Sequence, residues 1–221
     1  MARGRSADYE LNRETIVRTA TRLFAQQGYP GTSMSDLARE CGISKPLLYH
    51  YVSDKYELLS EITESHVTRL EALVGEVASL GLAPAPRLRE LIRRFVHEYA
   101  PARPDHGVLT QDVKFLEPKD RNRVLRKERA VVAAFAATIA QARPELAKAA
   151  LDKPLTMLLF GMINWMFTWL RPDGRLDHAA MAPLVVNLFM GGLDHLQVPS
   201  NVGAPASRSA SRSRSASRSK K

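Results

Sequence analysis

The chain has 221 residues and a formal net charge of +9, from 32 Lys and Arg against 23 Asp and Glu. Six of the cationic side chains lie in the last fifteen residues, which contain no acid, so the rest of the chain is nearly neutral. This distribution excludes a protein that is basic over its whole surface, and any affinity for DNA must come from a few well-placed cations. The single cysteine, Cys41, excludes a disulfide framework and indicates a small core residue in a reducing compartment.

The first residues, MARGRSADYELNRE, are polar and basic. They lack the apolar stretch of a secretory signal, so we expect a cytoplasmic protein in which residues 1–10 form a flexible arm. Arg3 and Arg5 would then be able to reach a DNA backbone or minor groove. A helix is predicted from Asn12 to Gly28. Its apolar stripe consists of Ile16, Ala20, Leu23 and Phe24.

Two short amphipathic segments joined by a tight turn come next. Ser33 precedes the first segment, and Gly42 ends it where a helix C-cap favours a left-handed residue. Ser44 is a good N-cap for the second segment, and Pro46 lies in its first turn, where a missing amide hydrogen costs nothing. This layout predicts a helix-turn-helix over about residues 34–53, which would place its second helix in a DNA major groove.

The second segment has an apolar side and a polar side. The residues expected to face the protein are Leu47, Leu48 and Val52. The residues left available to DNA are Lys45, Tyr49 and His50. Asp54 caps the following helix, so Lys55 lies in its first turn, where a cation suits the helix dipole poorly unless an anion such as a phosphate docks beside it. Simpler roles stay open: Tyr49 can cover the core edge, and His50 and Lys55 can be solvated surface residues.

The middle of the chain is predicted to be helical throughout. A long helix begins at Asp54 and a second helix covers 88–99. A region broken by Pro101, Pro104 and Gly107 leads to a segment over 111–116, and a helix over 120–142 and a short one over 145–151 follow. The apolar positions of the long helix are Leu58, Leu59, Ile62, His66, Leu70, Leu73 and Val77.

Residues 153–170 and 177–196 form two further predicted helices. The apolar part of the first is only sixteen residues long and contains Asn164, whereas a membrane span needs roughly 20 predominantly apolar residues. We therefore expect no membrane span and read the two helices as a hairpin that pairs two subunits. The fold class is all-α.

The segment from 199 to 221 is a low-complexity Ser/Arg/Ala tail. It has too little apolar surface to offset the entropy of ordering, so we expect it to be disordered. It either adds salt-sensitive, nonspecific attraction to nucleic acid or is a solvated appendage. Ser/Arg repeats also occur in splicing factors, but no RNA-recognition aromatic motif accompanies them here.

An enzyme is disfavoured, because the six histidines are dispersed and no metal-ligand spacing or glycine-rich phosphate loop is present. We expect no cofactor and no metal. The strongest candidate for a catalytic or metal centre would combine His97 and His106 with Asp105 and Asp112, provided that the Pro/Gly break folds them together.

The segment LFAQQGYPGTSMSDLARECGISKPLLYHYVSDKYELL resembles the DNA-binding domain of the TetR family of bacterial transcriptional regulators. The resemblance implies that Ser33, Tyr49 and Lys55 contact phosphates. It also implies that Lys45, Pro46, His50 and Tyr51 approach base edges. The complete set of expected DNA-binding residues is Ser33, Ser44, Lys45, Pro46, Tyr49, His50, Tyr51 and Lys55. Many members have glycine at the position of Pro46, and Leu47 replaces a common threonine, which puts a phosphate contact there in doubt.

A narrower resemblance is carried by LFGMINWMFTWLRPDG, by LTQDVKFL at 109–116 and by the opening MARGRSADYE. These segments are similar to TetR-type regulators of phenylacetate degradation and to acyl-CoA-responsive relatives, which release DNA on binding a coenzyme A thioester. An apolar interior could take the acyl or aryl group, and arginines of 121–129 could meet the phosphates. The effector-binding residues expected are Phe115, Arg121, Arg126, Phe160, Asn164 and Phe167. The alternative for each of these residues is a purely structural role, as a core residue or as a solvated charge.

The resemblance implies a DNA-binding domain over 11–71 and an effector-binding and dimerisation domain over 72–198. We therefore expect a homodimeric repressor that binds a palindromic double-stranded DNA operator and is released by a small effector. The dimer would form through residues 153–170 and 177–196, as the last two helices do in TetR-like proteins. The alternatives are a related regulator of an unrelated hydrophobic ligand, a helical ligand-binding module without DNA function, and a helical enzyme.

Overall fold

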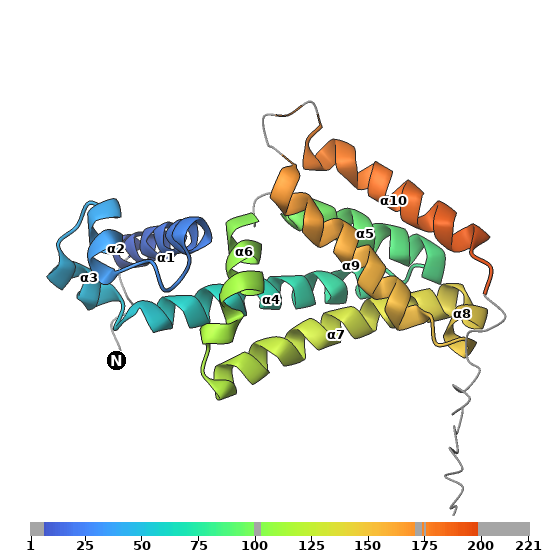
Figure 1. Ribbon diagram of the computed structural model, residues 1–221, viewed down its shortest axis with the longest axis horizontal. Helices are drawn as coiled ribbons and strands as arrows, with labels where there is room; N and C mark the ends of the chain where they lie inside the picture. The colour runs from blue at the N-terminus through green and yellow to red at the C-terminus, as the bar shows by residue number, and fades with distance from the viewer. Residues whose placement is uncertain (1–6, 100–102, 171–173, 175, 199–221) are drawn as a thin grey trace, which may run out of the picture.

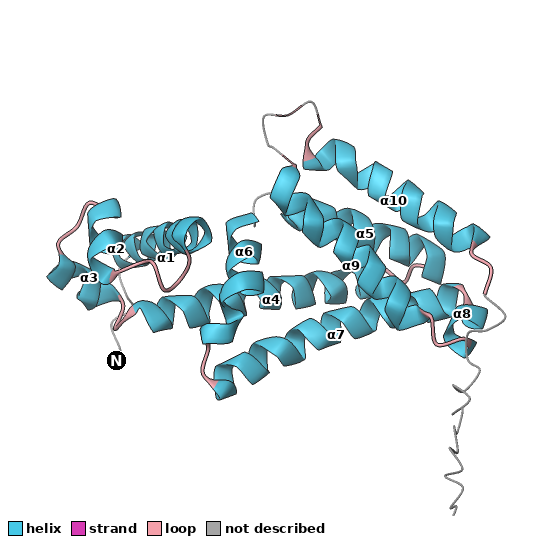
Figure 2. Cartoon of the chain, in the orientation of Figure 1, coloured by secondary structure: helices cyan, strands magenta, loops and turns pink. Residues whose placement is uncertain are grey.

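The computed structural model describes residues 7–99, 103–170, 174 and 176–198. Arg3 and Arg5 of the expected arm, and the whole Ser/Arg tail, lie outside these residues. Every regular element in the described part is a helix, as the sequence predicts (Figure 2). None of the described helices is long and apolar enough to cross a bilayer.

Three helices form one end of the molecule (Figure 1). They are α1 (Ala7–Gln27), α2 (Met34–Glu40) and α3 (Lys45–Tyr51). The first helix begins five residues earlier than the predicted Asn12, so residues 7–10 are helical and do not belong to the expected flexible arm. Asp8 and Glu10 stand in its first turn, where carboxylates complement the positive end of the helix dipole.

A long helix, α4 (Lys55–Ser79), connects this end to the rest of the molecule without a break at the expected domain boundary at residue 71. Asp54 caps it as predicted, with its carboxylate accepting from the Glu57 amide at 2.8 Å. All seven apolar positions predicted for this helix are buried. The remaining helices are α5 (Pro84–Tyr99), α6 (Arg103–Asp112), the 3-10 turn η1 (Val113–Phe115), α7 (Pro118–Ala142), α8 (Pro144–Lys148), α9 (Asp152–Trp169) and α10 (His178–His195).

Of the predicted break at Pro101, Pro104 and Gly107, Pro101 lies outside the described residues. The region of Pro104 and Gly107 is helical instead, because α6 runs through both residues. Proline is tolerated there because it lies in the first turn of the helix. A Cβ at Gly107 would lie 4.0 Å from the Cβ of Ala25, so α6 and α1 are in close contact at this point.

Buried apolar residues form two clusters. One belongs to α1–α4 and extends to Val108 and Leu109 of α6, Leu116, and Val124 of α7. The other joins the distal half of α4 with α5, α7, α9 and α10 around Phe95, Phe135 and Phe160. Helix α10 packs mainly on α5 and helix α9 mainly on α7, so the two helices are not the tight hairpin expected from the sequence.

Candidate DNA-reading helix and ligand cavity

The turn between α2 and α3 has the predicted geometry. Ser33 caps α2 by accepting a hydrogen bond from the Asp36 amide at 3.1 Å, while the Asp36 carboxylate accepts from the Ser33 amide at 3.1 Å. Gly42 adopts a φ of +68°, the left-handed conformation that favours glycine after a helix. Ser44 then caps α3 by accepting from the Leu47 amide. These caps fix the angle at which α3 leaves the turn.

Helix α3 is held from one side only. Leu48 is 0% exposed and Val52, directly after the helix, is 2% exposed, so this one stripe faces the core. Leu47 is 43% exposed, which corrects the prediction that it faces inward. Adjacent helical residues point about 100° apart, and the buried stripe is already occupied by the Leu48–Val52 pair. The side chains on the exposed surface of α3 include Lys45, Pro46, Tyr49 and His50.

Three other predicted DNA-binding residues have partners within the protein. The Tyr51 hydroxyl accepts a hydrogen bond from Asn12 Nδ2 at 3.1 Å, and its ring is half-buried. The Ser33 hydroxyl is exposed but donates to Asp36 Oδ2 at 2.6 Å. The Lys55 ammonium donates to the carbonyls of Tyr29 and Thr32 at 2.9 and 3.1 Å and lies 4.3 Å from the Tyr29 ring centre. The loop carbonyls therefore offset the unfavourable position of Lys55 at the start of α4.

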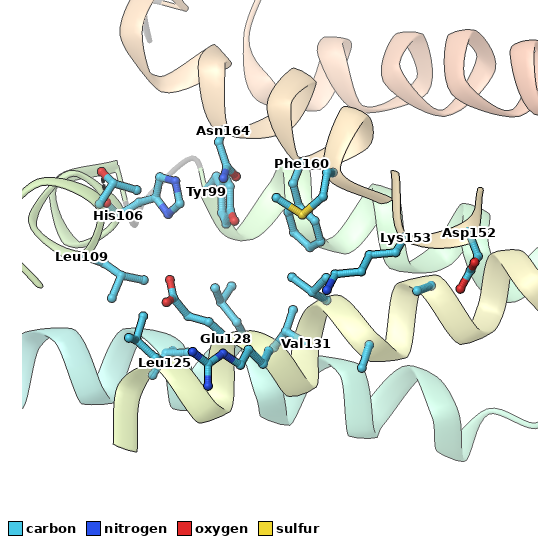
Figure 3. A pocket seen from close by; sticks show the side chains of 18 residues that line it. Tyr99, His106, Leu109, Leu125, Glu128, Val131, Asp152, Lys153, Phe160 and Asn164 are labelled. Carbon is cyan, nitrogen blue, oxygen red and sulfur yellow. Dashed lines mark hydrogen bonds between the residues drawn. The ribbon is translucent and has the colours of Figure 1, made fainter. Parts of the chain in front are cut away.

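A cavity of about 710 Å³ lies in the other part of the molecule (Figure 3). Side chains from α4, α5, α6, α7 and α9 surround it, and most of them are apolar. Its volume is within the range of pockets that bind small molecules. Apolar lining residues include Val67, Leu70, Leu109, Leu125, Val131, Val132, Met157 and Phe160.

Of the six predicted effector-binding residues, Phe160 and Asn164 line this cavity. Arg121 and Arg126 are exposed on α7 and are not part of the lining. Phe115 lies at the junction with the DNA-reading end, where its ring centre is 5.6 Å from that of Tyr29. The side chain of Phe167 lies outside the described part of the structure.

Sequence reasoning did not assign six polar lining residues to an effector site: Tyr99, His106, Thr110, Glu128, Asp152 and Lys153. Arg129, one of the arginines of 121–129 expected to meet phosphates, does line the cavity. His106 was named only as part of the candidate catalytic or metal centre. Glu128 is the acid among the cations of 121–129, and this position could have pointed to a binding site. The neighbouring Arg123 and Lys127 pair with Glu64 and Glu71 of α4.

Two polar groups in the cavity are poorly compensated. Burial raises the pKa of the Glu128 carboxyl, against a smaller opposing effect of Arg129. Asn164 Oδ1 is buried and accepts no hydrogen bond from the described residues. A buried acceptor without a donor carries a desolvation penalty, and a ligand that supplies a donor would remove it.

One helix is shared by the cavity and the DNA-reading end. His106, Leu109 and Thr110 of α6 line the cavity, while Val108 and Leu109 belong to the core around α1. At the end of α6, Asp112 Oδ2 accepts from the Tyr29 amide at 3.2 Å. The Tyr29 carbonyl in turn accepts from Lys55 at the start of α4. Displacement of α6 in the cavity would therefore reach the segment that positions α2 and α3.

The comparisons with known proteins agree with this architecture. Residues 16–62 match the family model described as bacterial regulatory proteins of the tetR family. Residues 81–193, half of the chain, match the tetracyclin repressor-like C-terminal domain. The chain belongs to the TetR family of transcriptional regulators.

Relatives of known structure cover nearly the whole TetR-type fold. A TetR-family regulator from Bordetella parapertussis is 34% identical, with a TM-score of 0.77 over 85% of this chain and 98% of that one. AibR, whose crystal structure contains isovaleryl coenzyme A and operator DNA, is 24% identical, with a TM-score of 0.69 over 80% and 97% of the two chains. At 24% identity, this similarity shows a shared fold and no more.

Some curated relatives match over a shorter span. The regulator AcrR of Shigella flexneri is 36% identical over 32% of this chain and 34% of its own length. The chain thus aligns with only about a third of AcrR, and the family membership rests on the longer matches above.

The last two helices of this TetR-family chain expose large apolar side chains. Leu158 and Trp165 of α9 are 65% and 67% exposed, and Leu188 of α10 is 69% exposed. Met157, Trp169 and Leu184 are exposed as well. Large apolar surfaces of this kind mark interaction sites.

The four residues of the alternative catalytic or metal centre do not form one site. His97 is exposed on α5, whereas His106 is buried against Tyr99. Asp105 pairs with Arg69, and Asp112 accepts from the Tyr29 amide. In the described ranges, no cluster of three or more His, Cys, Asp or Glu side chains could hold a metal ion.

His66 of α4 and His106 of α6 form a buried pair beside the cavity. His66 Nε2 lies 3.4 Å from His106 Nδ1, Arg69 approaches His66 Nδ1 at 3.2 Å, and the ring of Tyr99 stacks on His106 at 4.4 Å between ring centres. Burial lowers the pKa of His66 to about 3, with smaller contributions from His106 and Arg69, and burial lowers the pKa of His106 to about 4. Both rings are therefore neutral at physiological pH.

This pair predicts a pH-dependent stability. The pKa of a histidine in an unfolded chain is about 6.5, so below that pH the unfolded chain binds more protons than the folded one. The free energy of unfolding is then expected to fall as the pH falls from 6.5 to 5, by about 2 kcal/mol for each histidine. Urea denaturation at fixed protein concentration measures this loss.

Replacing His66 removes one of the two titrating groups, so His66→Gln should flatten the slope between pH 6.5 and 5. The exposed His97 provides the matched control, and His97→Gln should keep the wild-type slope. Burial raises the pKa of Glu128 and of Asp112, so these two acids increase the free energy of unfolding as the pH falls, opposite to the histidines. Both acids are present in the wild type and in each variant, so their contribution cancels when the slopes of the variants are compared with that of the wild type. Equal slopes for His66→Gln and the wild type would contradict the assignment.

Proposed function

We propose that this protein is a dimeric repressor that binds a palindromic operator through α3 and releases it when a coenzyme A thioester enters the cavity. The observation that carries the proposal is the position of α6, which lines the cavity and also packs in the core of the DNA-reading end. A ligand that binds one arrangement of α6 more tightly than the other would change operator affinity by the same factor by which DNA changes ligand affinity.

The DNA-reading surface would consist of the exposed side chains of α3, with Lys45 and His50 at base edges and Tyr49 on the backbone. Ser44 and Pro46 would begin the helix close to the duplex. Ser33 and Lys55 remain proposed phosphate contacts, although both already hold the local fold through internal hydrogen bonds. The near-neutral charge of the folded part makes affinity depend on these few positions.

The dimer would form through the apolar surface of α9 and α10, residues 153–170 and 177–196. Symmetric pairing of this surface would bury Leu158, Trp165 and Leu188 and present two recognition helices to the two halves of a palindrome. A monomer would leave these side chains in water.

A thioester effector is supported by the chemistry of the cavity. Its apolar lining suits an acyl or aryl group, and Arg129 and Lys153 supply cations for phosphates. Lys153 extends from the start of α9 toward the cavity (Figure 3). AibR, which shares the fold, was crystallised with isovaleryl coenzyme A and operator DNA. Phenylacetyl-CoA is the aryl candidate that the sequence resemblance implies.

DNA reading is tested by selecting duplexes from a random library and measuring gel shifts at physiological salt. Lys45→Ala should cost about 1–3 kcal/mol on the selected operator and relax preference at one position of each half-site. Tyr49→Ala should weaken binding to all sequences alike. Lys119→Ala, an exposed lysine on α7, serves as the control and should bind as the wild type does. If the folded wild-type protein selects no sequence, the chain is a ligand-binding module without DNA function.

Subunit pairing is tested by charging the proposed interface. Leu188→Glu should convert the dimer to a monomer in sedimentation experiments, because pairing would bury an unpartnered carboxylate. Operator affinity should fall at least ten-fold, since one recognition helix would then bind alone. Leu80→Glu places the same charge on another exposed leucine, at the end of α4, and should stay dimeric. A dimeric Leu188→Glu protein would place the interface elsewhere.

Effector binding is tested by blocking the cavity. Ala133 and Ala137, one turn apart on α7, are both exposed, but only Ala133 is part of the cavity lining. Ala133→Phe should raise the concentration of phenylacetyl-CoA or isovaleryl-CoA needed for operator release about ten-fold, while Ala137→Phe should leave it unchanged. The shift in melting temperature is then measured with each thioester, with coenzyme A alone and with free phenylacetate. The comparison shows which part of the thioester the protein binds. Release by an apolar compound that lacks coenzyme A would instead favour a regulator of an unrelated hydrophobic ligand.

A further inference from the structure

The recognition helix is too short to fix its own orientation. Helix α3 has seven residues, just under two turns, and Leu48 is its only fully buried side chain. A short helix anchored along a single stripe can roll about that stripe. The direction in which His50 and Tyr49 point must therefore be set by contacts from outside the helix-turn-helix.

Helix α1 makes those contacts through its first two turns. The ring centre of Tyr9 lies 4.8 Å from that of Tyr51 and 6.0 Å from that of His50, which it meets edge-on. Asn12, on the next turn, donates to the Tyr51 hydroxyl at 3.1 Å. Tyr51 is thereby held by an aromatic ring and by a directional hydrogen bond.

A second contact from α1 secures the joint between α3 and α4. Arg13 binds Glu61 at 2.5 and 2.6 Å and Glu57 at 3.2 Å. The Glu57 carboxylate also accepts from the amide and hydroxyl of Ser53, each at 2.8 Å. Asn12 thus contacts the α3 side of the joint through its hydrogen bond to Tyr51. Arg13 contacts the α4 side through Glu57 and Glu61.

We propose that Tyr9 and Asn12 are positioning residues for operator reading. They fix the position of Tyr51, and Tyr51 orients His50 instead of contacting a base. This inference rests on the proposed function of α3. It assigns base readout to the exposed residues of the helix and gives the first two turns of α1 a part in sequence preference. It also departs from the role that the TetR resemblance implies for Tyr51.

The test uses two substitutions that remove the same hydrogen bond, Asn12→Ala and Tyr51→Phe. With duplexes selected by the wild-type protein, each variant should lose about three- to ten-fold in preference at the same base pairs, with unchanged affinity for random DNA. The double variant should lose no more than either single one, because both changes break one bond. Asn122→Ala, an exposed asparagine on α7, should bind as the wild type does.

Tyr9 is tested separately because its contact is made by the ring. Tyr9→Leu should reduce preference at the positions affected by Asn12→Ala, and Tyr9→Phe should retain it. Circular dichroism and effector-induced thermal shifts establish that each variant is folded. Tyr51→Phe is conservative enough to decide the matter if the alanine variant does not fold.

Two results would overturn the inference. If Tyr51→Phe changes preference and Asn12→Ala does not, Tyr51 contacts the base itself. If the two losses add in the double variant, the residues act independently. Failure of the proposed function gives a different result, because the wild-type protein would then select no sequence at all.

Discussion

The central constraint in this structure is that α6 belongs to two environments. Leu109 packs in the core of the DNA-reading end and also lines the cavity. A densely packed core does not deform continuously, so a ligand that moves α6 must move its neighbours or be excluded. The hydrogen bond from the Tyr29 amide to Asp112 and the one from Lys55 to the Tyr29 carbonyl continue this connection without a flexible segment. Coupling between the two ends follows from packing.

Helix α4 limits the form that a response can take. It runs as one continuous helix from the recognition unit into the cavity wall, so the two parts are not joined by a free linker. Its contacts with α7 include the ion pairs of Glu64 with Arg123 and of Glu71 with Lys127. A partly exposed pair of this kind contributes little stability, and it can be exchanged for water at small cost. The α4–α7 contact therefore allows small shifts while the buried stripe of α4 keeps its register.

The sequence predicted most of the fold because the relevant signals are local. Ser33, Gly42, Ser44 and Asp54 act through their own backbone neighbourhood, and all four adopt the predicted conformations. Helical spacing likewise identified most of the buried positions of α4. The early start of α1 was missed, because a polar first turn of a helix has the same composition as a loop. The helix through Pro104 and Gly107 was missed, because proline and glycine occur both in loops and near the start of a helix.

The ligand cavity could be predicted only in part for a different reason. Phe160 and Asn164 were found on a strongly apolar helix, α9, but most of the other lining residues come from four further helices whose mutual placement no local signal gives. Arg121 and Arg126 were expected there because they are cationic, and the register of α7 turns them to the surface. Tyr51 shows the same limit at the DNA-reading end, since its partners Tyr9 and Asn12 are about forty residues away in the chain.

The electrostatics of the cavity restrict which ligands it can hold. Burial shifts the pKa values of His66, His106, Glu128 and Tyr99 toward their uncharged forms, and burial is the largest cause for each. A charged group on the ligand would face the same desolvation cost in this interior unless it found a paired partner. The exposed Arg129 can supply such a partner at lower cost, because its charge is already solvated. This arrangement suits the apolar part of a ligand in the interior and any negative charge of the ligand near Arg129.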